Sequence, residues 1–284
     1  MNFIIPSNLL FAKNPDTMIC MLRKSLTILY ILLLSGCTNR PRPIEQLWLL
    51  GSQAYYGQRY KKALHYLSQI EIHYSDAGCA KEALELVARA HFALGNELHS
   101  AYHYTETIKT CDFIITVDPD LAKAKDLYIL RIRAYYRAIP WKLDRCSQMI
   151  TDTLKAIDDY YKVMPNSVNR YRKELIDIKS RCSEYLIAQE ILKSKRLFEE
   201  DMLPVAALAK LDPIINSERK SLNTSEAFYR TIEIRDKMNC TTEELMDIFS
   251  SARWLDPWKT KAIKIISRRK LTPKQKLVLD KWKI

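Results

Sequence analysis

The sequence has little glycine and no long alternation of apolar and polar β-forming residues. It contains 5 glycines in 284 residues, and the period-two pattern of Val, Ile and Thr that marks strands is hard to find. Long stretches rich in Ala, Leu, Lys and Glu place apolar residues three and four positions apart instead, which is the period of an amphipathic helix. These features argue against a β-sheet protein and predict an all-α fold.

The sequence also lacks the short motifs of common enzyme sites. There is no GxSxG motif, no phosphate-binding glycine loop and no dinucleotide fingerprint. The carboxylate runs at 158–159 and 199–201 are adjacent residues that point apart on a helix, so they indicate solvated faces or turns. His99 and His103 have the spacing of two metal ligands on one helix face, but no third ligand accompanies them. We therefore predict no catalytic residue, no metal site and no cofactor, and a packing or surface role for His103.

Cysteine spacing indicates neither a zinc site nor a full disulfide framework. None of the seven cysteines forms a CxxC pair, and beyond Cys20 and Cys37 an odd number, five, remains. One bridge, between Cys146 and Cys182, is compatible with an oxidising compartment. The favoured alternative is that these cysteines are buried free thiols.

The net charge of +12 is concentrated at the end of the chain. Residues 258–284 carry ten Lys or Arg against Asp280 alone, whereas residues 37–257 are close to neutral. A nucleic-acid-binding protein needs a basic face on its folded domain. The distribution therefore argues against nucleic acid as a partner.

Residues 1–36 have the organisation of a leader that ends in a secretory signal. Arg23 and Lys24 precede an apolar run over 26–34, which is shorter than the roughly 20 residues that span a bilayer as a helix. Met18 and Met21 precede this signal, so translation from Met18 would leave residues 1–17 untranslated and translation from Met21 would leave residues 1–20 untranslated. Leu-Ser-Gly-Cys at 34–37 resembles a bacterial lipoprotein box, which implies cleavage before Cys37 and lipid attachment to it. An uncleaved signal anchor with an incidental cysteine is the alternative.

A proline-broken polar tether over 37–43 leads into a repeat that starts at Ile44. Gly51 and Ala63 have the spacing of the small residues through which two antiparallel helices interlock in a tetratricopeptide repeat, with the turn at 57–60. A weaker copy follows, with a turn at Gly95-Asn96 and an extension over 110–117. Three further helix pairs are predicted at 121–138 with 147–163, 171–200 with 204–215, and 225–238 with 242–252. Residues 44–257 are therefore predicted to form an α-solenoid of about five irregular repeats, with an irregular helical bundle as the alternative.

The lipoprotein signal, the tether and the five irregular repeats together resemble the BamD family of outer-membrane assembly lipoproteins over residues 37–257. The more specific pieces are the first repeat, 50–70, and the Tyr-Lys-Val-Met-Pro-Asn-Ser ending at 161–167. Ala206-Ala207 resembles a paired alanine of the family, but Lys210 stands near where the family commonly has asparagine-arginine, and it lacks the planar guanidinium fork. The extension over 110–117 and the basic segment 258–284 also depart from the family pattern.

The resemblance implies a non-enzymatic scaffold of the outer-membrane β-barrel assembly machine, facing the periplasm and anchored by lipid. Its implied partners are the barrel subunit BamA, accessory lipoproteins and the C-terminal segments of unfolded outer-membrane proteins, which often end in Phe. Thr38 after the lipidated cysteine favours the outer membrane by the same resemblance. The rival reading is a lipoprotein that organises peptidoglycan or an envelope secretion or pilus apparatus. A less favoured one is an enzyme with a site assembled across repeats.

The concave face of the first two repeats is the predicted peptide site. The register set by Leu50 and Gly51 turns aromatic and small side chains of the first helix toward this groove, and the predicted pocket comprises Trp48, Ser52, Tyr55, Tyr56 and Leu86. The alternative is that these aromatics fill the core between repeats. The resemblance places the barrel subunit on repeats three to five, with Arg145 and Lys210 as charged contacts.

The basic segment 258–284 has two readings. Apolar residues between its lysines, and a possible helix start at Thr272-Pro273, suggest a surface for anionic lipid or an acidic partner. A solvated, frayed terminus is the other and slightly favoured reading.

Overall fold

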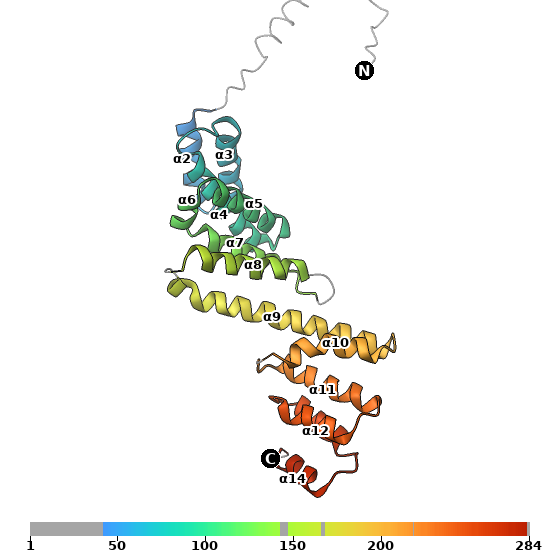
Figure 1. Cartoon of the computed structure of the whole chain (residues 1–284). Helices are drawn as coiled ribbons and strands as arrows, with labels where there is room; N and C mark the ends of the chain where they lie inside the picture. The colour runs from blue at the N-terminus through green and yellow to red at the C-terminus, as the bar shows by residue number, and fades with distance from the viewer. Residues whose placement is uncertain (1–41, 143–146, 166–167, 218, 283–284) are drawn as a thin grey trace, which may run out of the picture.

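The computed structural model describes residues 42–142, 147–165, 168–217 and 219–282. Within these ranges it contains thirteen helices and no strand, which confirms the all-α prediction. The helices lie side by side in an elongated stack from α2 to α14 (Figure 1), as in an α-solenoid. Their bounds are α2 Ile44–Tyr56, α3 Tyr60–His73, α4 Ala80–Leu98, α5 Ala101–Val117, α6 Pro119–Ala124, α7 Leu127–Ala138, α8 Ser147–Val163, α9 Val168–Glu199, α10 Pro204–Ile215, α11 Leu222–Lys237, α12 Thr242–Ser251, α13 Trp258–Ile266 and α14 Pro273–Lys281.

Several helix starts follow directly from capping residues. Thr241 forms a capping box with Glu244 at the start of α12, and Thr272 forms another with Gln275 at α14, where the sequence predicts a helix start. Asp118 caps α6 by accepting a hydrogen bond from the Leu121 backbone N–H. Each cap satisfies a backbone donor that the helix itself leaves free.

The first helix pair has the predicted geometry. Gly51 lies so close to α3 that a Cβ there would stand 2.6 Å from the Leu67 side chain. Ala63 is fully buried beneath α2 in a core with Leu47 and Leu67. The small residues therefore permit the close approach that the repeat pattern predicts.

Two predicted boundaries are wrong. Gly95-Asn96 is not a turn, because α4 continues to Leu98 and ends at His99 in a left-handed conformation. Residues 121–138 do not form one helix, because the chain breaks between α6 and α7 at Asp126, which has a φ of 54°. No glycine or proline marks this break in the sequence.

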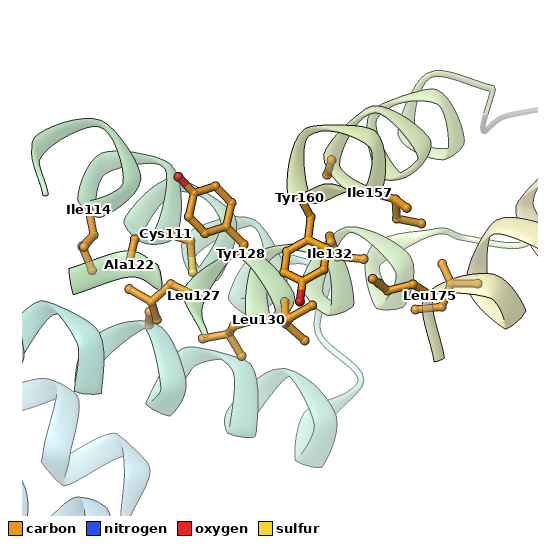
Figure 2. Packing of buried hydrophobic residues seen from close by; sticks show 14 of the residues in the cluster. Cys111, Ile114, Ala122, Leu127, Tyr128, Leu130, Ile132, Ile157, Tyr160 and Leu175 are labelled. Atoms are coloured by element: carbon orange, nitrogen blue, oxygen red, sulfur yellow. The ribbon is translucent and has the colours of Figure 1, made fainter. Parts of the chain in front are cut away.

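The central core is built from α4 to α9. Ile114, Leu127, Ile132 and Tyr160 are among its buried residues, and Leu175 enters it from α9 (Figure 2). α9, with 32 residues and a length of about 48 Å, joins this core to the next one. Its second half contributes Ile191 to a separate cluster with α10 and α11. One long helix therefore connects the two halves of the stack.

The basic segment is folded rather than frayed over its described part, residues 258–282. α13 and α14 bury Ala262, Ile266 and Leu279 in a core shared with Phe228 of α11 and Phe249 of α12. The favoured sequence reading of a solvated terminus is therefore wrong here.

Candidate functional site

A groove lies between α4, α5, α7 and α9. It consists of two adjoining cavities of about 900 and about 790 Å³. They share a central region, and we call the whole feature the central groove. The shared residues are His99, Tyr104, Tyr136, Arg137 and Arg181. A hollow of this size, open along its length, suits an extended chain.

The floor of the central groove depends on Gly95. A Cβ at this position would lie 2.6 Å from the Tyr104 ring, so only glycine lets α5 bring that ring against α4. Tyr104 is buried, donates a hydrogen bond to Asn96 Oδ1 at 3.1 Å and meets the Phe92 ring edge to face. Gly95 is therefore a packing residue of the site rather than a turn residue.

We expect Gly95→Ala to lower the free energy of unfolding by about 1–3 kcal/mol, because the buried Tyr104 ring has little room to move. Gly78→Ala is the matched control, since a Cβ there meets nothing within 4 Å. Urea unfolding followed by circular dichroism measures both variants. Equal stabilities for the two would contradict the close approach of α5 to α4.

One wall is held by an ion pair between α7 and α9. Arg133 donates to both carboxylate oxygens of Glu174, at 2.7 and 2.8 Å, and this fork geometry fixes the two helices relative to each other. The hydrogen bonds from Arg133 hold the pKa of the Glu174 carboxyl below its usual value. At the end of the groove that contains Arg133 and Glu174, Tyr171 donates to Asp126 at 2.7 Å, and Arg170 also pairs with Asp126.

Aromatic rings line the other end of the central groove. Trp141 lies between Tyr136 and Tyr185, with ring centroids 5.3 and 5.4 Å away and edge-to-face geometry. The Trp141 side chain is 43% exposed, so the row of rings presents an open apolar surface. Such a surface suits an apolar or aromatic side chain of a ligand.

Three cations of the central groove are available to a ligand. Within the described residues, Arg137, Lys173 and Arg181 have no carboxylate within 4 Å, unlike Arg133 and Arg170. Arg181 donates to the Tyr136 hydroxyl at 3.4 Å. The guanidinium groups at the centre can therefore bind a carboxylate beside the aromatic row.

The site predicted in the first repeat is not an open pocket. Leu86 is 6% exposed and belongs to the core under α2 and α3, and Trp48 and Tyr55 pack against that core. The Ser52 hydroxyl donates to the Trp48 backbone carbonyl at 2.7 Å, and Tyr56 is 75% exposed. The prediction fails at Leu86 because α4 packs against helices on both sides. The alternative reading, that the aromatics fill the core, holds for Trp48 and Tyr55.

The histidine pair of the sequence is also rearranged. His103 approaches His91 of α4, with the two Nδ1 atoms 3.0 Å apart, whereas His99 lies in the central groove. Burial, followed by the neighbouring His103, lowers the pKa of His91 to about 4. Over the described ranges, no group of three or more His, Cys, Asp or Glu side chains is placed to hold a metal.

Of the other residues that the sequence analysis singled out, the structure describes Lys210 and Cys182 but not Cys37, Arg145 or Cys146. Lys210 lies 3.6 Å from Glu190 of α9, so it pairs within the chain while remaining 46% exposed on its side chain. Cys37 and Arg145 lie outside the described residues, as does Cys146. Cys182 is a free thiol, and burial raises its pKa to about 11. None of the described helices is long and apolar enough to traverse a bilayer.

No protein-family model matches this chain, and no curated protein is significantly similar to it in sequence. The function is therefore inferred from the central groove, together with the sequence patterns.

Proposed function

We propose that this chain is a non-enzymatic scaffold subunit of an outer-membrane β-barrel assembly machine, anchored through lipid on Cys37. In this role it binds the barrel subunit BamA, accessory lipoproteins and the C-terminal segments of unfolded outer-membrane proteins. The resemblance to the BamD family over 37–257 motivates the proposal. The stacked helices with an open groove are compatible with it.

The observation that carries the substrate part is the chemistry of the central groove. Arg137 and Arg181 lie where its two cavities meet, and the Tyr136–Trp141–Tyr185 row continues from there. A peptide that ends in an aromatic residue offers a carboxylate for the guanidinium groups and a ring for the aromatic row. We therefore place substrate recognition in the central groove instead of the first repeat.

Co-purification from the outer membrane tests the partner. The tagged full-length chain is solubilised in mild detergent, and the bound chains are identified by mass spectrometry. We expect a large β-barrel protein with periplasmic repeat domains in stoichiometric amount. Wall-linked or secretin-like proteins in its place would overturn the proposal and support the rival cell-wall or secretion role.

Two cysteine variants, one of them a control, test the lipid anchor. Cys37→Ser removes the proposed lipidation site, so we expect this variant to lose acylation and to leave the outer-membrane fraction. Cys20 lies before the proposed cleavage point, so Cys20→Ser should change neither acylation nor the outer-membrane location. Acylation that persists in Cys37→Ser would contradict the anchor.

A further inference from the structure

The last two helices present a dense cluster of exposed cations. Their packing turns the charged side chains outward on both helices. We call this cluster the basic end surface, and its exposed members are Lys261, Lys264, Arg268, Lys270, Lys274, Lys276 and Lys281. The proposed scaffold function does not account for it.

Little of the charge of this surface is paired within the described residues. In the part of the chain that the structure describes, Arg269 is the one cation of the segment with a carboxylate within 4 Å, that of Asp236. Asp280 is the single acidic residue among residues 258–284. Lys261 lies over the Trp258 ring, 4.1 Å from its centroid, an arrangement that holds an ammonium without cancelling its charge.

The apolar faces of the same helices are already occupied. Ala262 and Ile266 of α13 and Leu279 of α14 are buried against Phe249 and Trp254. The helices therefore cannot turn these faces into a bilayer without breaking the core. Any contact with a partner is made by the outward charges. Among the described residues of the segment, Leu277 is the one large apolar side chain that is exposed, at 61%.

We infer that the basic end surface binds an anionic phospholipid surface. Six of its seven exposed cations are lysines, which act as point charges and lack the fork that selects a single carboxylate. Charges of this kind, spread over two helices and the segment between them, suit many phosphate headgroups at once. Each such cation contributes about 1 kcal/mol near an anionic membrane, and salt screens the attraction.

The position of the basic end surface determines how the chain would lie on a membrane. α14 lies at the end of the stack opposite α2, the helix that follows the proposed tether (Figure 1). A chain held at both ends would lie along the membrane rather than project from it. The inference itself stands independently of the barrel-assembly proposal.

Vesicle flotation tests the inference. The protein is the chain from Thr38, which retains every described helix and lacks Cys37, so that lipidation cannot contribute. We expect it to float with phosphatidylglycerol-containing vesicles at low salt, to stay unbound with phosphatidylcholine vesicles, and to be released by 0.5 M salt, at which the screening length is only about 4–5 Å.

Charge-neutralising variants locate the contact. Lys264, Lys270, Lys274 and Lys276 are changed together to Gln, and we expect partitioning onto anionic vesicles to fall at least about tenfold. The control changes four exposed lysines of other helices and loops to Gln and removes the same amount of charge. These are Lys61, Lys62, Lys155 and Lys220. The control should partition within about twofold of the unchanged chain. Thermal unfolding of both variants verifies that the fold is intact.

Two outcomes would overturn the inference. One is equal loss in both variants, which would mean that total charge alone controls binding. The other is no binding of the unchanged chain to anionic vesicles. Capture of an acidic protein by the basic end surface in that second case would assign the surface to a protein partner instead.

Discussion

Replacing both Arg137 and Arg181 by Glu should lower the affinity for a peptide with a free C-terminal aromatic residue by about 100-fold or more. A hydrogen bond to a charged group contributes about 1.5–3 kcal/mol, and the variant replaces two donors with two repelling carboxylates. Both side chains are exposed and have no carboxylate partner among the described residues, so their loss should not unfold the protein. Fluorescence anisotropy with a labelled peptide that ends in Phe measures the affinity.

Two controls separate carboxylate recognition from a general charge effect. Lys61→Glu with Lys62→Glu makes the same charge change on α3, away from the central groove, and should leave the affinity nearly unchanged. Amidation of the peptide C-terminus should weaken binding to the unchanged chain but have little further effect on the Arg137 and Arg181 variant. If amidation weakens binding to both proteins equally, the two arginines do not hold the carboxylate.

Phe249→Ala should destabilise the C-terminal part of the stack by about 3–5 kcal/mol. The Phe249 side chain is fully buried and contacts the rings of Trp254 and Trp282, at centroid distances of 5.1 and 5.8 Å. Its removal leaves a cavity where α12 meets the last helices. The unfolding transition seen by tryptophan fluorescence should shift to lower urea concentration.

The matched control for this prediction is Phe113→Ala on α5. Phe113 is 54% exposed, so its loss should change the free energy of unfolding by no more than about 0.5 kcal/mol. A Phe249→Ala protein as stable as Phe113→Ala would show that α13 and α14 do not depend on this core.

The helices were predictable wherever their ends carry a chemical signal. Pro204 and Pro273 begin helices at the predicted positions, and Thr241 caps the helix predicted to start at residue 242, because each satisfies or removes a free backbone donor. Gly95 misled the prediction because a glycine can serve close packing as well as a turn. The break at Asp126 has no local signal, since it depends on how α6 and α7 pack in the core.

The central groove was not predictable from the sequence. Most of its residues come from α4, α7 and α9, and Asn96, Arg133 and Arg181 are far apart in the chain without a shared motif. The repeat pattern indicated which positions of a helix face its partner helix. It did not indicate whether further helices bury the remaining positions. Leu86 shows the difference, because its predicted concave face is covered by neighbouring helices. The prediction of a frayed basic segment was wrong because the charge pattern does not reveal that the apolar residues between the charges complete a core.

The most direct test of the account is site-specific photo-crosslinking to an outer-membrane protein peptide that ends in Phe. A photoreactive amino acid is placed either at Ser180, which lines the central groove, or at Tyr56, which is exposed in the predicted first-repeat site. We expect a crosslink from position 180 that an excess of unlabelled peptide abolishes, and none from position 56. A competed crosslink from position 56 alone would contradict it and return substrate binding to the first repeat.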